Sequence, residues 1–446
     1  MTLKQSFFNV EIDELTGGEL LLFNTLTTAF GIVEKKMRQL YETIEEVDIA
    51  SITDDELLEN IKVMRNHKFL VDKDIDELKL YKYWERTGRY SSDTFGLTIA
   101  PTLNCNMRCP YCYEDKLDKA MDDKTQEALI KFVKNKLESG VYKKFATSWF
   151  GGEPLLKKDI IEYLSGEFIR LCKENNIEYK SEIITNGILL DRETALMLKE
   201  KCKVSFVQIT VDGIREIHNK RRILASHGDS FEIITNNIDA AKDIIFIMVR
   251  CNIDRTNINE AEKLIDYFLT ERKWGEAVGL YFAPVENISD HCKTNSSHCY
   301  SRQEFGLIES DLLRKIYDRG SFKLIQYLYP TSQVVSCAAI STNFYVVDPL
   351  GNLYKCWDVM SDSSKNVGDI FNGELMNREN LNWLCMDTPI QCLECNLLPL
   401  CNGGCPHRRL INDNTPTCWN KTVSFKENLR IVFEEYKKLN HIYDCA

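Results

Sequence analysis

The chain has 446 residues, of which 44% are hydrophobic and 28% are charged, and this composition is typical of a globular protein with two or three domains. Its formal charge of −11 argues against nucleic acid as a partner, because like charges repel each other. No apolar run approaches the roughly 20 residues of a membrane-spanning helix, and residues 1–10 lack the pattern of a signal peptide, so we expect a cytoplasmic protein without a membrane partner.

Residues 1–90 are expected to form the first domain. Alternating apolar residues predict strands in SFFNVEI, ELLLFN and FGIVE, and a helical period predicts two helices in KKMRQLYETI and DDELLENIKVMRN. A further strand, KFLVD, and a helix over 75–88 complete this domain. The order of its elements suggests a small winged-helix-like module, and the alternative is a structural cap on the next domain.

Residues 91–290 repeat one unit, a short apolar strand followed by an amphipathic helix. The expected strands are 95–100, 146–150, 181–185, 205–211, 245–253 and 278–284, and the expected helices are 125–138, 157–176, 192–202, 231–243 and 258–272. Alternating units of this length predict a parallel sheet of the α/β class, and six of them form a partial (β/α)6 TIM-like barrel. In such barrels the carboxyl ends of the strands carry the chemistry.

Seventeen cysteines are present, and ten of them fall into two groups. In a reducing compartment this number indicates metal or redox chemistry rather than a disulfide framework. The first group, Cys105, Cys109 and Cys112, has the spacing C-x3-C-x2-C and directly follows the first expected barrel strand. Metal sites built from thiolates usually have four ligands. Either a distant protein ligand completes a structural zinc site, or one metal position stays open for a small molecule.

Three further segments follow expected barrel strands. They are WFGGEPLL at 149–156, IITNGILL at 183–190 and VQITVDGIREIHNKRR at 207–222. Each segment alone is explained as a turn or a strand exit. Together with the cysteines they resemble the radical SAM family, whose C-x3-C-x-φ-C signature the chain carries with Tyr111 as the aromatic residue. The resemblance implies a [4Fe–4S] cluster on the three cysteines, with S-adenosylmethionine (SAM) on the fourth iron as the source of a 5′-deoxyadenosyl radical.

The same resemblance implies contacts between the protein and SAM. The segment Gly151, Gly152, Glu153 and Pro154 is similar to the GGEP segment of the family, and Asn186 lies in a Thr-Asn-Gly turn found in many relatives. The missing glycine side chains would let the backbone approach the cofactor, and backbone carbonyl groups and Glu153 would receive its ammonium group.

The third segment resembles a family segment that contacts the ribose and the carboxylate of SAM. The resemblance assigns these contacts to Thr210 and Arg222, with Asp212 shaping the turn between them. Asn219 stands where many relatives have Asp, which leaves the roles in this segment open. The stretch GLYFAPVEN, at the end of the sixth strand, is also expected to line the site.

After a connector at 291–336, residues 337–446 hold the second group of cysteines. Their spacing begins as C-x13-G-x4-C, continues as C-x2-C-x5-C-x3-C and ends with one more cysteine. A zinc ribbon needs only four cysteines in two pairs. Seven in this order resemble the loop-rich SPASM domain, the accessory iron–sulfur module of radical SAM enzymes that modify peptides. The resemblance places one auxiliary [4Fe–4S] cluster on Cys392, Cys395, Cys401 and Cys418, and a second one on Cys337, Cys356 and Cys405.

SAM and three clusters are expected in all. The second auxiliary cluster would have only three cysteine ligands. A scattered cysteine (Cys299, Cys385 or Cys445) or the substrate would supply its fourth ligand. Because Cys sulfur is the natural ligand of iron–sulfur clusters, we expect an open iron that takes a thiolate of the substrate, and this sulfur would trap a carbon radical.

The combination resembles maturases of ribosomally made peptides that form thioether cross-links, of the ranthipeptide and sactipeptide type. The resemblance implies a precursor peptide whose leader joins a sheet edge of the N-terminal domain as an added strand, and a flavodoxin or ferredoxin as electron donor. The alternatives are an anaerobic sulfatase-maturing enzyme that makes formylglycine and a maturase that forms carbon–carbon cross-links or epimers. A non-catalytic iron–sulfur electron carrier is a further alternative, of a different class.

Overall fold

The structure is a computed structural model, and it describes residues 2–15, 18–114, 117–275, 277–286, 297–321, 323, 328–333, 335–360 and 362–440. The chain forms two compact units. Unit 1 comprises Met1–Arg89, Tyr327–Cys337 and Asp387–Ala446, and unit 2 comprises Tyr90–Gln326 and Ala338–Met386. Residues 337–446, which the sequence suggested as one domain, therefore contribute to both units.

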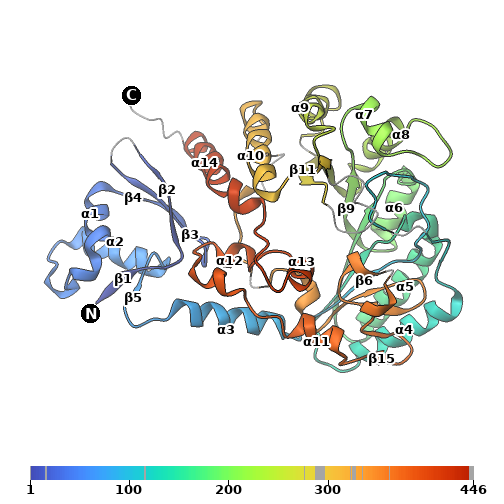
Figure 1. Cartoon of the computed structure of the whole chain (residues 1–446), viewed down its shortest axis with the longest axis horizontal. Helices are drawn as coiled ribbons and strands as arrows, with labels where there is room; N and C mark the ends of the chain where they lie inside the picture. The colour runs from blue at the N-terminus through green and yellow to red at the C-terminus, as the bar shows by residue number, and fades with distance from the viewer. Residues whose placement is uncertain are drawn as a thin grey trace. The chain divides into compact units, whose positions relative to one another are not determined.

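Unit 2 is built on a ten-stranded sheet with the order β11-β10-β9-β8-β7-β6-β12-β13-β14-β15 (Figure 1). Its consecutive parallel strands are β6 (Thr94–Ile99), β7 (Lys144–Trp149), β8 (Glu178–Thr185), β9 (Val204–Thr210), β10 (Phe246–Ile253) and β11 (Val278–Pro284). The six predicted strands and the α/β class are confirmed. The sequence did not predict the extension beyond β6, which consists of β12 (Phe344–Val347), β13 (Asn352–Tyr354), β14 (Gly368–Asp369) and β15 (Gly373–Glu374).

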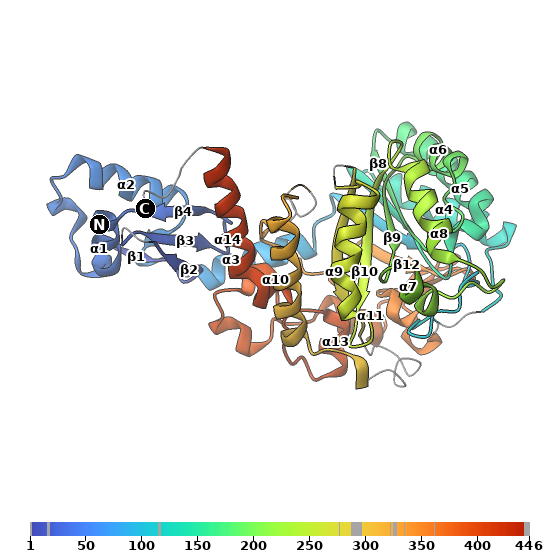
Figure 2. The ribbon, with the colours of Figure 1, turned by 90° about the horizontal axis from the view of Figure 1, so that it is seen from above.

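Helices cover one face of the parallel strands, with α4, α5, α6 and α8 along it (Figure 2). The helices of unit 2 are α4 (Asp123–Leu137), α5 (Lys158–Glu174), α6 (Arg192–Glu200), α7 (Arg215–Arg221), α8 (Ser230–Ala241), α9 (Ile258–Asp266), α10 (Arg302–Asp318) and α11 (Arg378–Leu384). Asp122, Asp191 and Asp229 precede α4, α6 and α8, and each accepts a hydrogen bond from the backbone three residues on. These caps satisfy N–H groups that the first turn leaves open.

The strand alternation separates the helix-covered face from the interior of the barrel. On β10, Ile247, Val249 and Cys251 are fully buried. Their neighbours Arg250 and Asn252 point to the opposite face, because successive side chains of a strand alternate. The polar residues of this strand therefore face the inside of the curved sheet.

Unit 1 combines the two ends of the chain around the three-stranded antiparallel sheet β2-β3-β4. Its elements are β1 (Leu3–Gln5), β2 (Asn9–Glu14), β3 (Leu20–Asn24), β4 (Phe30–Val33), α1 (Lys35–Thr43), α2 (Asp55–Asn66), β5 (Leu70–Asp72), α3 (Glu77–Arg89), α12 (Leu398–Cys401), α13 (Pro406–Ile411) and α14 (Lys421–Leu439). Every predicted element of residues 1–90 is present, whereas the short β1 and two 3₁₀ helices, Ile44–Glu46 and Ile49–Ser51, were not predicted. Among the described helices, none is long and apolar enough to cross a membrane.

Both faces of β3 are buried, which explains its continuous apolar sequence. Leu20 and Leu22 pack with residues of α1 and α2, whereas Phe23 packs with Phe425 and Leu429 of α14. The C-terminal helix is thus part of the core of the N-terminal sheet.

Candidate functional site

The carboxyl ends of the parallel strands of unit 2 surround a cavity of about 210 Å³. All three cysteines of the first group line it. The predicted cofactor contacts that also line it are Tyr111, Gly151, Gly152, Asn186, Thr210 and Arg222. The structure therefore brings together residues that lie more than a hundred positions apart in the sequence.

The loop that carries the three cysteines is fixed by the segment after α7. The backbone N–H of Arg108 donates to the carbonyl oxygen of Ile223 at 2.7 Å, and the N–H of Ala225 donates to the oxygen of Asn106 at 2.9 Å. The Arg108 guanidinium also donates to the carbonyl oxygen of Cys105 at 2.6 Å. These bonds fix the conformation of the loop at the carboxyl ends of the strands.

The two glycines of the GGEP segment lie against the cysteine loop. The N–H of Gly152 donates to the carbonyl oxygen of Thr102 at 3.1 Å. A Cβ atom on Gly151, whose φ is +104°, would lie 2.5 Å from that oxygen, and one on Gly152 would lie 2.4 Å from the oxygen of Asn104. Glycine is needed here because two backbones come too close for a side chain. The nearest neighbour of these glycines is thus the cysteine loop, although the sequence suggested that they make room for a cofactor.

Glu153 does not line the cavity. It is fully buried, and its carboxylate accepts hydrogen bonds from the Thr185 hydroxyl at 2.7 Å and from the backbone N–H groups of Asn186 at 2.7 Å and Leu155 at 3.0 Å. Burial raises the pKa of this carboxyl group. The described partners of Glu153 are thus protein groups, and its contact with the ammonium group of SAM stays a prediction. Pro154 is likewise buried, at the start of a short 3₁₀ helix.

Glu153 instead positions Asn186, which the sequence also singled out. The Asn186 amide donates to the side-chain oxygen of Asn106 at 2.7 Å and lies 3.9 Å from the Cys105 sulfur. The backbone N–H of Met107 donates to the same sulfur at 3.4 Å. Burial raises the pKa of the Cys105 thiol, and the N–H of Met107 opposes this rise because it favours the thiolate, which is the form that binds metal.

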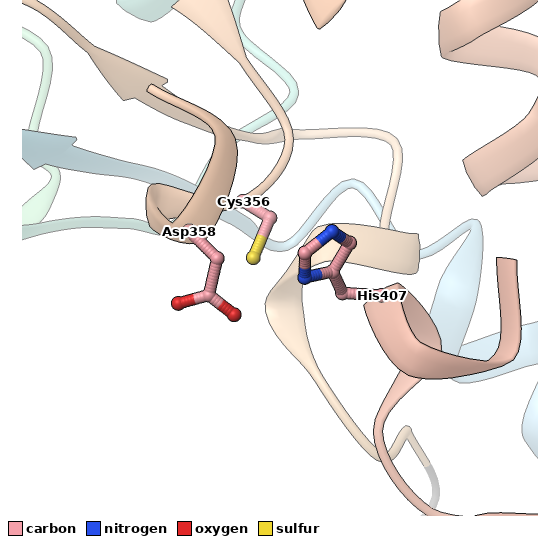
Figure 3. A group of neighbouring side chains, drawn as sticks. All are labelled: Cys356, Asp358 and His407. Atoms are coloured by element: carbon pink, nitrogen blue, oxygen red, sulfur yellow. The ribbon is translucent and has the colours of Figure 1, made fainter. Parts of the chain in front are cut away.

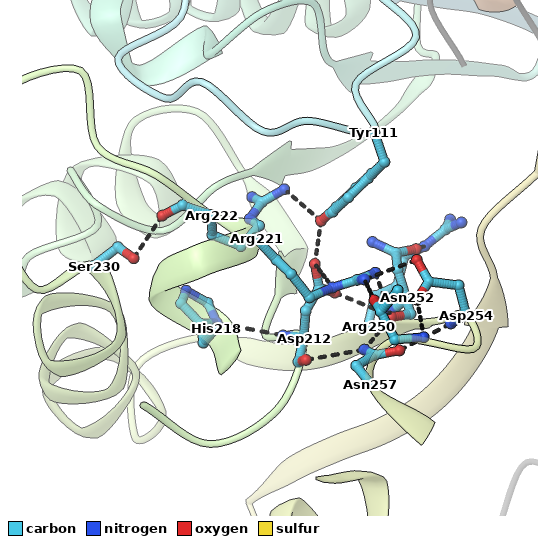
Figure 4. Close-up of polar contacts among 11 residues, drawn as sticks. Tyr111, Asp212, His218, Arg221, Arg222, Ser230, Arg250, Asn252, Asp254 and Asn257 are labelled. Carbon is cyan, nitrogen blue, oxygen red and sulfur yellow. Dashed lines mark hydrogen bonds and ion pairs between the residues drawn. The ribbon is translucent and has the colours of Figure 1, made fainter. Parts of the chain in front are cut away.

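Tyr111 joins the cysteine loop to the end of β9 (Figure 4). Its hydroxyl donates to the Asp212 carboxylate, and Arg222 donates to the same hydroxyl at 3.4 Å. Burial, and then the charge of Asp212, raise the pKa of Tyr111. Asp212 is itself fully buried and accepts from the N–H of Asn252 at 2.9 Å. Tyr111 and Asp212 thereby fix the guanidinium of Arg222 at the cavity.

Asn219 has a structural role away from the cavity. Its side-chain nitrogen donates to Asp229 at 2.9 Å, and its oxygen accepts from the Ser230 hydroxyl and the Phe231 N–H, both at 2.9 Å. These bonds tie α7 to the beginning of α8. The replacement of the Asp found in many relatives therefore does not change the cavity wall.

Residues 99–268 match the family model described as the radical SAM superfamily. This part of the chain is a radical SAM domain. A cysteine-type anaerobic sulfatase-maturating enzyme from Clostridium novyi (strain NT) is 27% identical over 385 residues, which is 78% of this chain and 97% of the relative.

Two solved structures resemble the chain beyond this domain. Native anSMEcpe with bound AdoMet has a TM-score of 0.58 at 20% identity and covers 78% of this chain and 100% of its own. Streptococcus suis SuiB bound to precursor peptide SuiA has a TM-score of 0.53 at 14% identity and covers 95% and 100%. At these identities the likeness concerns the fold.

The residues of the radical SAM domain fit a [4Fe–4S] cluster and SAM. The three cysteines come from one loop and open on one cavity, and two N–H donors point at the sulfur of Cys105. Arg222 supplies a positive charge at the same cavity, as the carboxylate of SAM would require.

Sequence reasoning missed several residues of the cavity wall. Gln208, Arg250 and Asn252 line it from the inside of β9 and β10, and Phe150 and Tyr113 also contribute. The available signal was the pair of polar residues at alternate positions in the otherwise apolar strand FIMVRCNI. The expectation that the end of the sixth strand lines the site is met by Pro284, Val285 and Glu286.

His218 of the radical SAM domain is fully buried behind this wall. Its Nδ1 accepts from the backbone N–H of Asp212 at 3.3 Å, which requires a neutral ring. Burial, followed by the charges of Arg222 and Arg221, lowers the pKa of His218 well below its ordinary value of 6.5.

The pKa of His218 makes the stability of the radical SAM domain dependent on pH. Above pH 6.5 the ring is neutral in both states, whereas below it only the unfolded chain takes up the proton. We therefore expect the free energy of unfolding to fall by up to about 1.4 kcal/mol per pH unit as the pH drops below 6.5. Anaerobic urea unfolding at several pH values measures this loss, which should be smaller in His218→Gln. Equal pH dependence in both proteins would contradict the assignment.

Four cysteines of the second group lie together in unit 1. Burial, with added effects of the Cys418 and Cys395 charges, raises the pKa of Cys392 to about 11. Burial, and then mainly the charges of Cys392, Cys418 and Cys395, raise the pKa of Cys401 to about 12. The charges of Cys418 and Cys395 act on both Cys392 and Cys401, so the four sulfurs lie near one another, as the ligands of one cluster would.

The other three cysteines of this group are distributed over both units. Cys337 and Cys405 belong to unit 1 and Cys356 to unit 2. Cys356 directly precedes the short 3₁₀ helix that holds Asp358, and His407 lies in α13 (Figure 3). Of the scattered candidates for a fourth ligand, Cys299 and Cys385 are described, whereas Cys445 lies outside the described residues.

Proposed function

We propose that this chain is a radical SAM maturase that joins a cysteine sulfur of a ribosomally made precursor peptide to a carbon of another residue. The observation that carries the proposal is the second gathering of four cysteines, in unit 1, in addition to the three at the cavity. Two auxiliary clusters, on the two ligand sets expected from the sequence, belong to the proposal. A cytoplasmic location and a flavodoxin or ferredoxin as electron donor also belong to the proposal.

When bound, the cluster and SAM supply a 5′-deoxyadenosyl radical that removes a hydrogen atom from the substrate. The residues of the chain orient and enclose the reactants. Gly151 and Gly152 hold the cysteine loop in place, and Tyr111 and Asp212 would hold Arg222 where it can pair with the carboxylate of SAM. The surrounding wall keeps water away from the reacting groups.

The N-terminal sheet is the proposed site for the leader of the precursor. Among the described strands, β4 pairs only with β3, so one row of its backbone hydrogen-bonding groups is available to an added strand. Ile32 of β4 is 45% exposed and offers an apolar contact. The likeness to SuiB, which was solved with a precursor peptide, supports this assignment because it extends over the N-terminal region.

Mass spectrometry of a peptide that copurifies under anaerobic conditions tests the proposed reaction. The reconstituted protein is incubated with SAM and dithionite, and the peptide is compared before and after treatment with a thiol-alkylating reagent. We expect 5′-deoxyadenosine, the loss of two hydrogens from the peptide and one fewer alkylated thiol. Loss of two hydrogens with all thiols intact would instead indicate a carbon–carbon cross-link, and hydrogen exchange without a mass loss would indicate epimerisation.

A second candidate is an anaerobic sulfatase-maturing activity. It is favoured by the Clostridium novyi relative, which this chain matches over nearly all of that protein's length. The Cp18Cys peptide, which was solved with anSMEcpe, serves as the probe. Conversion of its thiol to an aldehyde, detected with a hydrazide reagent, would place this activity first.

The auxiliary cluster of unit 1 leads to a prediction about iron content. We expect Cys395→Ala to lower the iron content by about four atoms per chain, because the mutant lacks one of four ligands. Formation of 5′-deoxyadenosine without peptide should persist. The control is Cys172→Ala, which removes a buried thiol of α5 and should leave the iron content unchanged. Unchanged iron in Cys395→Ala would contradict the ligand set.

A further inference from the structure

Three side chains on the inner face of β9 and β10 form a polar wall of the cavity. These residues, called the donor wall below, are Gln208, Arg250 and Asn252. In the strand register, Arg250 lies opposite Thr210 of β9 and Tyr281 of β11. The donor wall thus belongs to rigid, paired strands rather than to loops.

The side-chain oxygens of Asn252 and Gln208 in the donor wall each accept a hydrogen bond from a neighbouring side chain. The Nε of Arg250 donates to the side-chain oxygen of Asn252 at 2.7 Å, and the Tyr281 hydroxyl donates to the side-chain oxygen of Gln208 at 2.7 Å. Because an arginine Nε can only donate, the orientation of the Asn252 amide is fixed. Among the described residues, no acceptor is bound to the amide nitrogens of Asn252 and Gln208. The donor wall therefore offers N–H groups to the cavity.

Arg250 also lacks an anionic partner. Arg221 pairs with Asp254 at 2.7 Å and Arg302 pairs with Glu286 at 2.8 Å. No carboxylate of the described residues forms an ion pair with Arg250, whose guanidinium lies 5.9 Å from the ring centre of Tyr281. Arg250 is only half-buried in the cavity wall, so its guanidinium keeps part of its hydration and gains from an anion that replaces the rest. A ligand that carries the missing negative charge would supply this anion.

The donors and the charge together define the ligand. A carboxylate only accepts hydrogen bonds when ionised, and its two oxygens match the planar fork of a guanidinium. SAM brings one carboxylate, for which Arg222 is available beside Tyr111 in the cysteine loop. Arg250 is held separately, by Asn252 of its own strand. Two carboxylates, Glu114 and Glu286, also line the cavity, but Glu286 pairs with Arg302 and neither forms an ion pair with Arg250. Arg250 therefore remains available to a second anion.

We propose that the donor wall binds a carboxylate of the peptide substrate, in the side chain of an Asp or Glu at the modified residue or next to it. This inference rests on the proposed function, because it assumes a peptide in the cavity. It names the chemical class of residue that the site selects. The binding is electrostatic and bidentate, so an amide of the same shape is a poor replacement.

Two substitutions separate substrate binding from cofactor binding. Arg250→Gln removes the charge, and Arg250→Lys keeps it but loses the fork. Arg170→Gln, on the exposed surface of α5, is the matched control. We expect Arg250→Gln to lower kcat/KM for the copurifying peptide by about 10- to 100-fold, with a smaller loss for Arg250→Lys. The dissociation constant of SAM should change less than about twofold. An equal loss of SAM binding would overturn the proposal, because the bound anion would then be the carboxylate of SAM.

A double-mutant cycle identifies the carboxylate. Each Asp or Glu of the peptide is replaced by Asn or Gln, and every version is assayed with the wild type and with Arg250→Gln. We expect one replacement to reduce kcat/KM by a similar factor in the wild type and to have little further effect in the variant. A wild type that modifies the peptide without any such coupling would overturn the inference and leave the proposed function intact.

A small probe tests the donor wall without the precursor peptide. The SAM-loaded wild type and Arg250→Gln are heated in about 50 mM N-acetylaspartate amide or N-acetylasparagine amide. A ligand that binds only the native state raises the melting temperature. We expect a rise of about 1 °C for the wild type with the acid and none with the amide or in the variant. Equal shifts for acid and amide would overturn the inference even if no peptide were ever modified.

Discussion

Replacing Gly152 with Ala is expected to abolish formation of 5′-deoxyadenosine and to lower the iron content by about four atoms per chain. The added Cβ would lie 2.4 Å from the carbonyl oxygen of Asn104 and 2.6 Å from that of Leu103. Both obstacles are backbone atoms, so no side-chain rotation relieves the overlap. The cysteine loop must move away from the GGEP segment and break its hydrogen bond to Gly152. We expect this to cost about 1–3 kcal/mol and to displace Cys105.

Gly166→Ala is the matched control for Gly152→Ala. Gly166 lies within α5, and a Cβ atom there meets no atom within 4 Å. Because Ala favours a helix more than Gly does, this change should stabilise the protein by about 0.5–1 kcal/mol. Iron content and SAM cleavage should not change. A Gly152→Ala protein with full iron and normal SAM cleavage would show that the contact between the two loops does not hold the cluster site.

Glu153→Ala is expected to cause the second large loss. It removes the acceptor of three buried donors, the Thr185 hydroxyl and the N–H groups of Leu155 and Asn186. Each unsatisfied donor costs about 1–3 kcal/mol, and we expect a total of about 3–6 kcal/mol. Asn186 would lose its anchor, and its contacts to Asn106 and the Cys105 sulfur would be lost with it.

Glu153→Gln separates the structural role from direct cofactor binding. Its amide keeps one acceptor but turns an N–H group toward the N–H of Asn186, so we expect a loss of stability of about 1–3 kcal/mol. The free energy of unfolding in urea and the iron content should both decrease from the wild type to Glu153→Gln, and further to Glu153→Ala. Glu174→Ala, an exposed partner of Arg170, should cost less than about 1 kcal/mol. Normal stability with weaker SAM binding in Glu153→Gln would instead support a direct contact between Glu153 and the ammonium group of SAM.

The structure explains why the sequence predicted the position of the GGEP segment but not the protein contacts of Glu153. The segment marks the correct loop, since its glycines lie beside the cysteines. The direction of the Glu153 side chain depends on Thr185, the last residue of β8, and on Asn186, which directly follows it. Neighbours of this kind depend on the register between strands, and register is set by packing across the whole sheet.

The polar wall of the cavity likewise depends on contacts between strands that the sequence does not reveal. Arg250 and Asn252 were hidden in a strand that the sequence correctly identified as buried. Their importance comes from the adjacent strands, where Tyr281 lies opposite Arg250 and Gln208 lines the same cavity. Alternation along one strand shows that two polar residues share a face, but it does not show whether this face meets a cavity or solvent.

The sequence by itself determined the six strand–helix units, the strand after which the cysteines come, and the order of the segments around the cavity. These features are local, because periodicity, capping residues and ligand spacing extend over a few turns or strands. Only the tertiary structure decided that residues 387–446 share a core with residues 1–89, that Glu153 faces inward and that Arg250 faces the cavity. Each of these depends on contacts between residues far apart in the chain, which no local pattern encodes.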